Sequence, residues 1–306
     1  MFDGTGTAAV DQTLRLRDGR QLGYAEFGDP QGSPAFHFHG FPGTRLTARL
    51  HAADAAEAGV RLISPDRPGM GLSDFQARRR IIDWPADVSE LADALGIDRF
   101  AVLGLSGGGP YALACASEIP QRLTLCGIIS GMVPIDYAMQ AQNVKRTNVA
   151  LFRMARRTPW LLHPVIWLAL GRISRNEEAM RKTLRASFGE LPPQDRELME
   201  DPSIERVIVE DAMEVHRHGS KGCAHELKLY GRDWGLRLED IACERILLWH
   251  GELDVNLPAE AMRRLVAQIP NCKATFYPDE AHLSTMLRHG TEFMAAVREA
   301  SGASTT

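Results

Sequence analysis

The sequence predicts an α/β fold with a mostly parallel central sheet flanked by helices. Short apolar runs that end in Gly, Asp or Ser alternate with helix-like segments, which is typical of βαβ units. The alternation stops in mid-chain and then resumes, and 306 residues with 44% hydrophobic content can bury a large core. We therefore expect one α/β core in residues 1–133 and 236–306, with a helical lid or cap in residues 134–235 inserted after the sixth strand.

The first part of the chain predicts a hairpin followed by strand and helix repeats. Residues 13–28, TLRLRDGRQLGYAEFG, alternate in polarity and turn at Asp18-Gly19, which indicates a β-hairpin. Helices are expected at RLTARLHAADAAEAG (45–59) and DWPADVSELADALG (83–96), where Asp83 can cap the second helix and Gly96 can end it. The expected strands are AFHFHG (35–40), VRLISPD (60–66), FAVLGLS (100–106) and LCGIISG (125–131).

From about Pro134 to Gly235 the pattern is helical, without strands. Part of this insertion has an apolar surface, formed by Trp160, Leu161, Val165, Trp167 and Leu168. These side chains are interpreted as packing on the main domain, or as a lid face that lines a substrate pocket. Contact with a lipid interface is a further alternative, disfavoured because the helix lacks a polar face rich in Lys and Arg. The α/β pattern then resumes with the strand RILLWHG (245–251), the helix PAEAMRRLVAQIP (258–270), the strand KATFYPD (273–279) and the helix TEFMAAVREA (291–300).

The stretch FAVLGLSGGGPYALACA, residues 100–116, contains a glycine-rich turn between a strand and a helix. A Walker A phosphate loop is excluded because no Lys follows the glycines. Gly107, Gly109 and Ala112 match a dinucleotide fingerprint weakly, but the next strand ends in Ser130-Gly131 rather than in an acid that could hold ribose. Nucleotide binding is therefore disfavoured.

The same turn matches G-x-S-x-G, from Gly104 through Ser106 to Gly108. In a strand-to-helix elbow of this kind the serine hydroxyl is exposed above the sheet, and the residues two before and two after it are pressed together. Gly104 and Gly108 meet that requirement, and Pro110 fits the first turn of the following helix. We therefore predict that Ser106 is a nucleophile.

A nucleophilic serine needs a base and a carboxylate that orients it. His282 lies just after the last predicted strand, where such a base is expected, whereas His250 is more typical of a turn. For the acid we choose Asp254 in the loop after the preceding strand, with Glu252 as its rival and Asp136 as a distant third.

The oxyanion of an acyl-transfer reaction needs two backbone donors. Gly107, the residue after the nucleophile, should provide one of them. The loop after residues 35–40 should provide the other: Pro42 has no N–H, so we assign Phe41, with His39 and Gly40 supporting the loop.

These motifs together resemble those of the α/β-hydrolase superfamily. HGFPG resembles its oxyanion loop, DRPGMGLSD (66–74) the loop after its next strand, GLSGGG its nucleophile turn, HGELD its acid loop and AHLS its histidine loop. The resemblance covers about residues 13–300 except the insertion, and it departs from the family in having Ala281, where Gly often precedes the histidine. It implies an α/β-hydrolase fold and a serine esterase-like enzyme with a Ser-His-Asp triad, and it disfavours the activities that use an Asp nucleophile.

The expected substrate is a small to medium apolar carboxylic ester or lactone. The alternatives with the same triad are a C–C bond hydrolase and a cofactor-free perhydrolase, and a non-catalytic binding protein on this scaffold is a further one. We expect no metal and no cofactor, because no ligand spacing is regular; the cluster with metal-capable side chains is His216, His218, Cys223 and His225.

Composition limits the partners and the compartment. A net charge of −4 argues against nucleic acid as a partner. The basic clusters QARRR (76–80) and RMARR (153–157) are interpreted as solvated faces, with ion pairs between lid and body as the alternative. Five cysteines without a CxxC motif, an N-terminus without an apolar run, and no apolar stretch of membrane-spanning length favour a cytoplasmic protein without stable membrane association. We expect a monomer or a homodimer.

Overall fold

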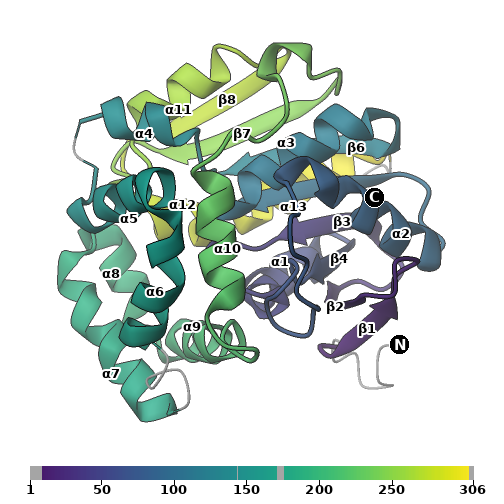
Figure 1. Ribbon diagram of the computed structural model, residues 1–306. Helices are drawn as coiled ribbons and strands as arrows, with labels where there is room; N and C mark the ends of the chain where they lie inside the picture. Colours follow the sequence, from purple (N-terminus) through teal and green to yellow (C-terminus); the bar gives the residue numbers. More distant parts are fainter. Residues whose placement is uncertain (1–8, 143, 171–175, 303–306) are drawn as a thin grey trace.

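An eight-stranded sheet forms the centre of the computed structural model, which describes residues 9–142, 144–170 and 176–302 (Figure 1). The strand order is β1-β2-β4-β3-β5-β6-β7-β8, with β1–β2 and β2–β4 antiparallel and every other pair parallel. The strands are β1 (Gln12–Arg15), β2 (Gln21–Gly28), β3 (Ser33–Phe38), β4 (Val60–Pro65), β5 (Phe100–Leu105), β6 (Leu123–Ile129), β7 (Ile246–Gly251) and β8 (Cys272–Tyr277). The predicted α/β class with a mostly parallel sheet is confirmed.

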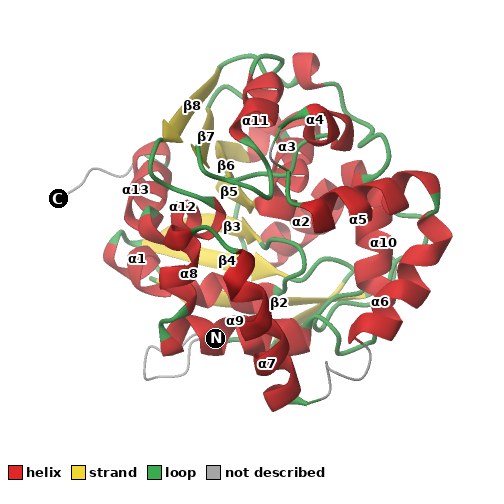
Figure 2. Cartoon of the chain, turned by 90° about the vertical axis from the view of Figure 1, so that its left-hand side faces the viewer, coloured by secondary structure: helices red, strands yellow, loops and turns green. Residues whose placement is uncertain are grey.

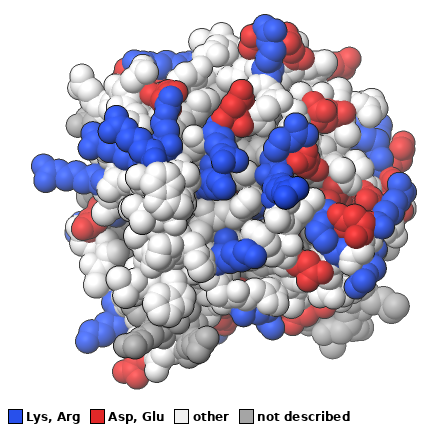
Figure 3. All heavy atoms as spheres, in the orientation of Figure 1, with Lys and Arg blue, Asp and Glu red and all other residues white. Residues whose placement is uncertain are grey.

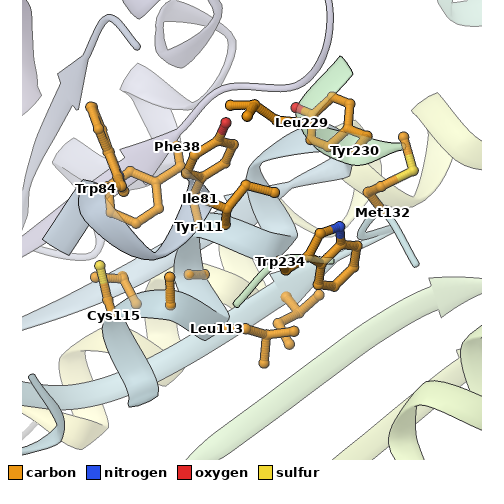
Figure 4. Close-up of a cluster of buried hydrophobic side chains, with 14 of the residues drawn as sticks. Phe38, Ile81, Trp84, Tyr111, Leu113, Cys115, Met132, Leu229, Tyr230 and Trp234 are labelled. Carbon is orange, nitrogen blue, oxygen red and sulfur yellow. The ribbon is translucent and has the colours of Figure 1, made fainter. Parts of the chain in front are cut away.

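Helices cover both faces of this sheet (Figures 1 and 2). On one face α1 (Ala52–Glu57) and α13 (Gly290–Ala300) enclose a core that includes Phe27 and Phe293. On the other face α2 (Trp84–Ala94), α3 (Gly109–Glu118) and α11 (Ala259–Val266) bury a larger cluster that includes Trp84, Tyr111 and Leu113 (Figure 4). This burial fixes the strands, so that the loops at their carboxyl ends can be held at one edge of the sheet.

Local signals explain most of the element boundaries, with one correction. Gly19 in the hairpin turn and Gly96 after α2 both have the positive φ that glycine adopts without strain (+89° and +69°). The expected helix at 45–59 begins as a 3₁₀ helix, Arg45–His51, and continues as α1. The expected capping of α2 by Asp83 is wrong: its carboxylate accepts a hydrogen bond from the Arg80 amide (2.8 Å) and so closes the preceding turn.

Between β6 and β7 the described chain contains helices and no strand. They are α4 (Ile135–Gln140), α5 (Arg146–Arg157), α6 (Leu162–Leu170), α7 (Glu177–Ser187), α8 (Pro193–Met199), α9 (Pro202–Glu214) and α10 (Lys221–Tyr230). The last three return to the core: α8 packs on α12 (His282–Arg288), α9 packs on the 3₁₀ helix Arg45–His51, and α10 runs between the insertion and the sheet (Figure 1). Helices far apart in the sequence therefore meet the loops that follow β3 and β8.

The apolar surface of the insertion faces outward. Trp160, Trp167 and Leu168 are 69%, 61% and 80% exposed, and Leu161 and Val165 are also exposed. Leu162 and Ile166, on the other side of α6, are the buried ones. Both interpretations of these five side chains, as packing on the main domain or as the lining of a pocket, are therefore wrong. The surface over α6 carries few charged side chains (Figure 3), and none of the described helices is long and apolar enough to cross a membrane.

Candidate active site

The turn between β5 and α3 holds Ser106 in a left-handed backbone conformation, with φ of +47°. The turn can close because Gly104 and Gly108 lack side chains. A Cβ on Gly104 would lie 2.6 Å from the Gly108 carbonyl oxygen, and a Cβ on Gly108 would lie 2.1 Å from the Phe38 carbonyl oxygen. A strained backbone thus presents a partly exposed serine at the end of a buried strand.

Loops from two later strands bring a histidine and a carboxylate to this serine. His282, the first residue of α12, follows β8, and Asp254 lies in the loop after β7. The Nε2 atom of His282 lies 3.0 Å from Ser106 Oγ, and its Nδ1 atom lies 2.6 Å from Asp254 Oδ2. The other carboxylate oxygen of Asp254 accepts hydrogen bonds from the Asn256 and Leu257 amides (2.8 and 2.9 Å). The three side chains form a continuous hydrogen-bonded chain.

A glycine allows the two loops to touch. A Cβ on Gly251 would lie 2.3 Å from the Glu280 carbonyl oxygen and 2.6 Å from that of Ala281. Leu253 N–H donates a hydrogen bond to the Glu280 carbonyl (2.9 Å), which joins the acid loop to the histidine loop. Ala281, which stands where the resembling family often has Gly, is fully buried in this contact.

The electrostatics of the pair keep Asp254 ionised and favour binding of a proton by His282. Burial acts to lower the pKa of His282, but the charge and hydrogen bond of Asp254, with a contribution from Asp195, raise it above its usual value. Burial acts to raise the pKa of Asp254, but His282, His250 and the Leu257 amide lower it below its usual value. Asp254 is therefore a carboxylate that can stabilise a protonated His282.

The rival residues make other contacts. Glu252 pairs with Arg263 on α11, and Asp136 pairs with Arg156 on α5. His250 is buried, and its Nε2 atom lies 2.8 Å from the Leu257 carbonyl oxygen and 3.8 Å from Asp254. His250 therefore supports the acid loop.

The loop after β3 lies against the serine turn. A Cβ on Gly40 would lie 3.4 Å from Ser106 Cβ, and the Phe41 nitrogen would lie 3.1 Å from a Cβ on Gly107. Phe41 joins Pro42 through a cis peptide bond. Gly107 is in the first turn of a helix, where N–H groups have no partner within the helix. The Phe41 and Gly107 backbones thus lie side by side next to Ser106.

His39 braces this loop as a neutral imidazole. Its Nε2 atom accepts a hydrogen bond from Arg67 N–H (3.2 Å), so Nδ1 carries the proton and donates to the Gly40 carbonyl (2.9 Å). Burial, reinforced by the charge of Arg67, lowers the pKa of His39 well below its usual value.

Sequence reasoning missed buried polar residues that the insertion contributes. Asp195 on α8 accepts a hydrogen bond from Ser284 N–H (2.8 Å) in the first turn of α12. Asp211 on α9 accepts one from Thr44 N–H (2.8 Å), in the loop that follows β3. Glu226 on α10 is fully buried among arginines. In the sequence these three acids do not differ from the many acids that lie on the surface, so no local pattern predicts that they are buried.

The sequence-based interpretation of the basic cluster QARRR (76–80) needs one correction. Arg79, in the cluster QARRR, is buried, donates a hydrogen bond to the Tyr111 hydroxyl (2.8 Å) and pairs with Glu226. The interpretation of this cluster as a solvated face is wrong at Arg79, where the alternative, an ion pair between lid and body, holds.

Known proteins resemble this chain at the level of family and fold. A family model described as "Alpha/beta hydrolase family" matches residues 35–297. Among curated proteins, a proline iminopeptidase of Xylella fastidiosa is 34% identical over 117 residues, which are 36% of this chain and 36% of that protein. The matched stretch therefore spans about a third of that relative's length.

Solved structures match nearly the whole chain. A putative aryl esterase from Burkholderia cenocepacia has a TM-score of 0.68 and 20% identity, covering 95% of this chain and 99% of its own. A meta-cleavage product hydrolase from Pseudomonas fluorescens has a TM-score of 0.63 and 19% identity, covering 96% and 98%. At such identities the likeness establishes the fold and leaves the substrate open.

Proposed function

The chain belongs to the alpha/beta hydrolase family, and from this premise we propose that it is a serine hydrolase of the carboxylesterase type. Its proposed substrate is a small to medium apolar carboxylic ester or lactone. The observation that carries the proposal is the hydrogen-bonded chain from Ser106 Oγ through His282 to Asp254, with Ser106 at a strained, positive φ.

In the proposed mechanism Ser106 Oγ attacks the substrate carbonyl while His282 Nε2 takes its proton. The imidazolium then gives that proton to the leaving alcohol, and an acyl-serine remains. His282 next activates a water that releases the acid and restores Ser106. Asp254 holds Nδ1–H throughout, which selects the tautomer with a free Nε2 lone pair and stabilises the positive charge.

The Phe41 and Gly107 amides are the proposed oxyanion donors. Both lie beside Ser106, and neither position is a proline. A negative charge that develops near the start of α3 is also favoured by the helix dipole. Every step is carried by groups of this chain, so the proposed reaction requires no added metal or cofactor.

The proposed ester or lactone substrate has weaker support than the proposed triad. Trp160, Leu161, Val165, Trp167 and Leu168 are exposed, so these side chains do not support an apolar pocket. The support is the fold shared with a putative aryl esterase. The fold shared with a meta-cleavage product hydrolase keeps a C–C bond hydrolase as the second candidate.

Labelling and a substrate panel test the proposal. We expect a fluorophosphonate probe to label Ser106, and p-nitrophenyl esters of increasing acyl length to be turned over in preference to proline p-nitroanilide and a vinylogous diketone. Preference for the diketone would select the C–C hydrolase, and peracid formation from acetate and peroxide would select the perhydrolase. A folded, monodisperse protein that neither labels nor turns over any of these would refute the enzyme and favour a binding protein.

A further inference from the structure

Helix α10 carries a buried acid that is linked to the backbone near both proposed oxyanion donors through Arg67 and Tyr230. Glu226 is completely buried, and its carboxylate contacts Arg67, Arg79 and Tyr230. We propose that Glu226 is a positioning residue: by holding Arg67 and Tyr230 it fixes the backbone that presents the Phe41 and Gly107 amides. The catalytic meaning of this inference rests on the proposed function.

Arg67 links Glu226 to the loop that carries Phe41. Its Nε donates to Glu226 Oε1 (2.7 Å), while Nη1 donates to the His39 carbonyl (2.5 Å) and Nη2 to the Gly40 carbonyl (2.8 Å). The Gly40 carbonyl and the Phe41 N–H belong to the same planar peptide unit and point in opposite directions. Holding that carbonyl toward Arg67 therefore directs the Phe41 N–H away from Arg67.

Tyr230, at the end of α10, links Glu226 to Gly107. Its hydroxyl oxygen lies 2.8 Å from Glu226 Oε1 and 2.8 Å from the Gly107 carbonyl oxygen. The single hydroxyl proton can be donated to either acceptor. The Tyr230 ring also packs edge-on against Phe41, with centroids 5.8 Å apart. Tyr230 thus contacts both residues that carry the proposed donors.

A second arginine keeps Glu226 charged in this buried place. Arg79 pairs with Glu226 Oε2 and donates to the Tyr111 hydroxyl (2.8 Å), while the Arg67 guanidinium lies 4.9 Å from the centre of the Tyr111 ring. Figure 4 shows Tyr111 and Tyr230 in the same cluster. Burial acts to raise the pKa of Glu226, but the two arginines and the Tyr230 hydroxyl lower it to about 2. A charged Glu226 can thus orient both partners at any pH at which the enzyme works.

The insertion offers a matched control. Glu205 on α9 is buried and also holds two arginines, Arg181 (2.9 Å) and Arg185 (2.5 Å), but both lie on α7, within the insertion. Glu205→Gln therefore removes a carboxylate with two arginine partners, which are more exposed than those of Glu226, without touching the oxyanion loop. A purely structural role for Glu226 predicts that Glu226→Gln loses stability while its kcat stays at the level of Glu205→Gln.

The kinetic test compares these variants on a p-nitrophenyl ester. A missing oxyanion donor costs about 10²–10³-fold in kcat in enzymes of this type, so misdirected donors in Glu226→Gln should lower kcat roughly 10–100-fold with little change in KM. The affinity for a trifluoromethyl ketone, whose serine adduct carries an oxyanion, should fall in parallel. Glu205→Gln should keep kcat within about twofold. If folded Glu226→Gln keeps kcat and ketone affinity at the level of Glu205→Gln, the inference is wrong.

A spectroscopic test is independent of turnover. In protein labelled with ¹⁵N-phenylalanine and ¹⁵N-glycine, the Phe41 and Gly107 amide resonances should move in Glu226→Gln and stay in place in Glu205→Gln. Unmoved resonances would overturn the inference even in an active enzyme, whereas moved resonances in a protein that never labels at Ser106 would refute only the proposed function. If Glu226→Gln does not fold, Tyr230→Phe keeps the ring against Phe41 and should still move the Gly107 resonance; an unmoved resonance there counts equally against the inference.

Discussion

His282 Nδ1 and Asp254 Oδ2 lie 2.6 Å apart, although the two residues come from loops that follow different strands. Both side chains are buried, so the bond is shielded from water. In the proposed reaction this contact gives the carboxylate a role without contact with the substrate. Without it the imidazole can rotate, or it can carry its proton on the nitrogen that faces Ser106.

Asp254→Asn should therefore leave the shape of the site intact and lower kcat. An amide favours the wrong histidine tautomer, and the corresponding change in a serine protease costs about 10⁴-fold. We expect a loss of that order in ester turnover and in the rate of fluorophosphonate labelling. Glu252→Gln, in the same loop, is the control and should keep near-normal activity, because Glu252 pairs with the exposed Arg263. Equal losses in the two variants would show that the acid was misassigned.

Ser106→Ala should abolish ester turnover without unfolding the protein. Removal of the nucleophile of a triad typically costs about 10⁴–10⁶-fold in kcat. Alanine still has to adopt the positive φ of this turn, so the thermal midpoint should stay close to that of the wild type. The measurements are steady-state turnover and circular dichroism melting; turnover within tenfold of wild type would contradict the proposed nucleophile.

The pH profile should report the carboxylates around His282. The base works only when it is neutral, so kcat/KM should fall as pH drops through the raised pKa of His282, above its ordinary value of 6.5. Asp195→Asn keeps an oxygen for the Ser284 amide and removes a charge that contributes to this shift. The acid limb of the profile should move to lower pH in that variant. A limb that stays in place would show that Asp195 is uncharged in the working enzyme.

The proximity of Ser106, His282 and Asp254 could be predicted because the signals for these residues are local. Ser106, Asp254 and His282 each follow an apolar strand, and parallel strands bring such loops to one edge of a sheet. The residues that hold the site could not be predicted in this way. Arg79 lies in a run of arginines that is typical of a solvated surface, and its partner Glu226 is 147 residues away.

The sequence also could not predict which side of the apolar helix α6 faces solvent. Residues 162–170, LHPVIWLAL, are apolar around most of the helix, so no polar side marks the surface that solvent covers. Only the packing of Leu162 and Ile166 against the rest of the molecule decides which side faces inward.

Gly108→Ala should be far more destabilising than Gly96→Ala. Gly108 has an ordinary φ of −76°, so the cost is purely steric: the new Cβ would lie 2.1 Å from the Phe38 carbonyl oxygen. Gly96 has φ of +69°, and a Cβ on it would meet no atom within 4 Å, so only backbone strain is added. Chemical denaturation should give a loss of about 3 kcal/mol or more for the first and about 1 kcal/mol for the second. Similar losses would show that the serine turn relaxes easily.

Asp211 should make stability depend on pH. Burial, opposed by the Thr44 hydrogen bonds, raises its pKa from the ordinary 3.8 to about 8. The folded protein therefore binds one more proton than the unfolded chain between these values, so this contribution to stability is complete below pH 3.8 and is lost as pH rises through 8. Asp211→Asn is neutral at every pH and keeps an oxygen for Thr44, so the variant should gain stability relative to wild type as pH rises, by up to about 1.4 kcal/mol per pH unit.

Urea denaturation between pH 6 and 9 measures this difference. Asp201→Asn provides the control on the same helix: hydrogen bonds from Ser203 lower the pKa of this exposed acid, so it is ionised in both states throughout the range. The free energy of unfolding of Asp201→Asn should run parallel to that of wild type, because the cap it weakens is lost equally at each pH. A parallel curve for Asp211→Asn would instead mean that Asp211 is already ionised in the fold at pH 6, with its charge stabilised by the Thr44 hydrogen bonds alone.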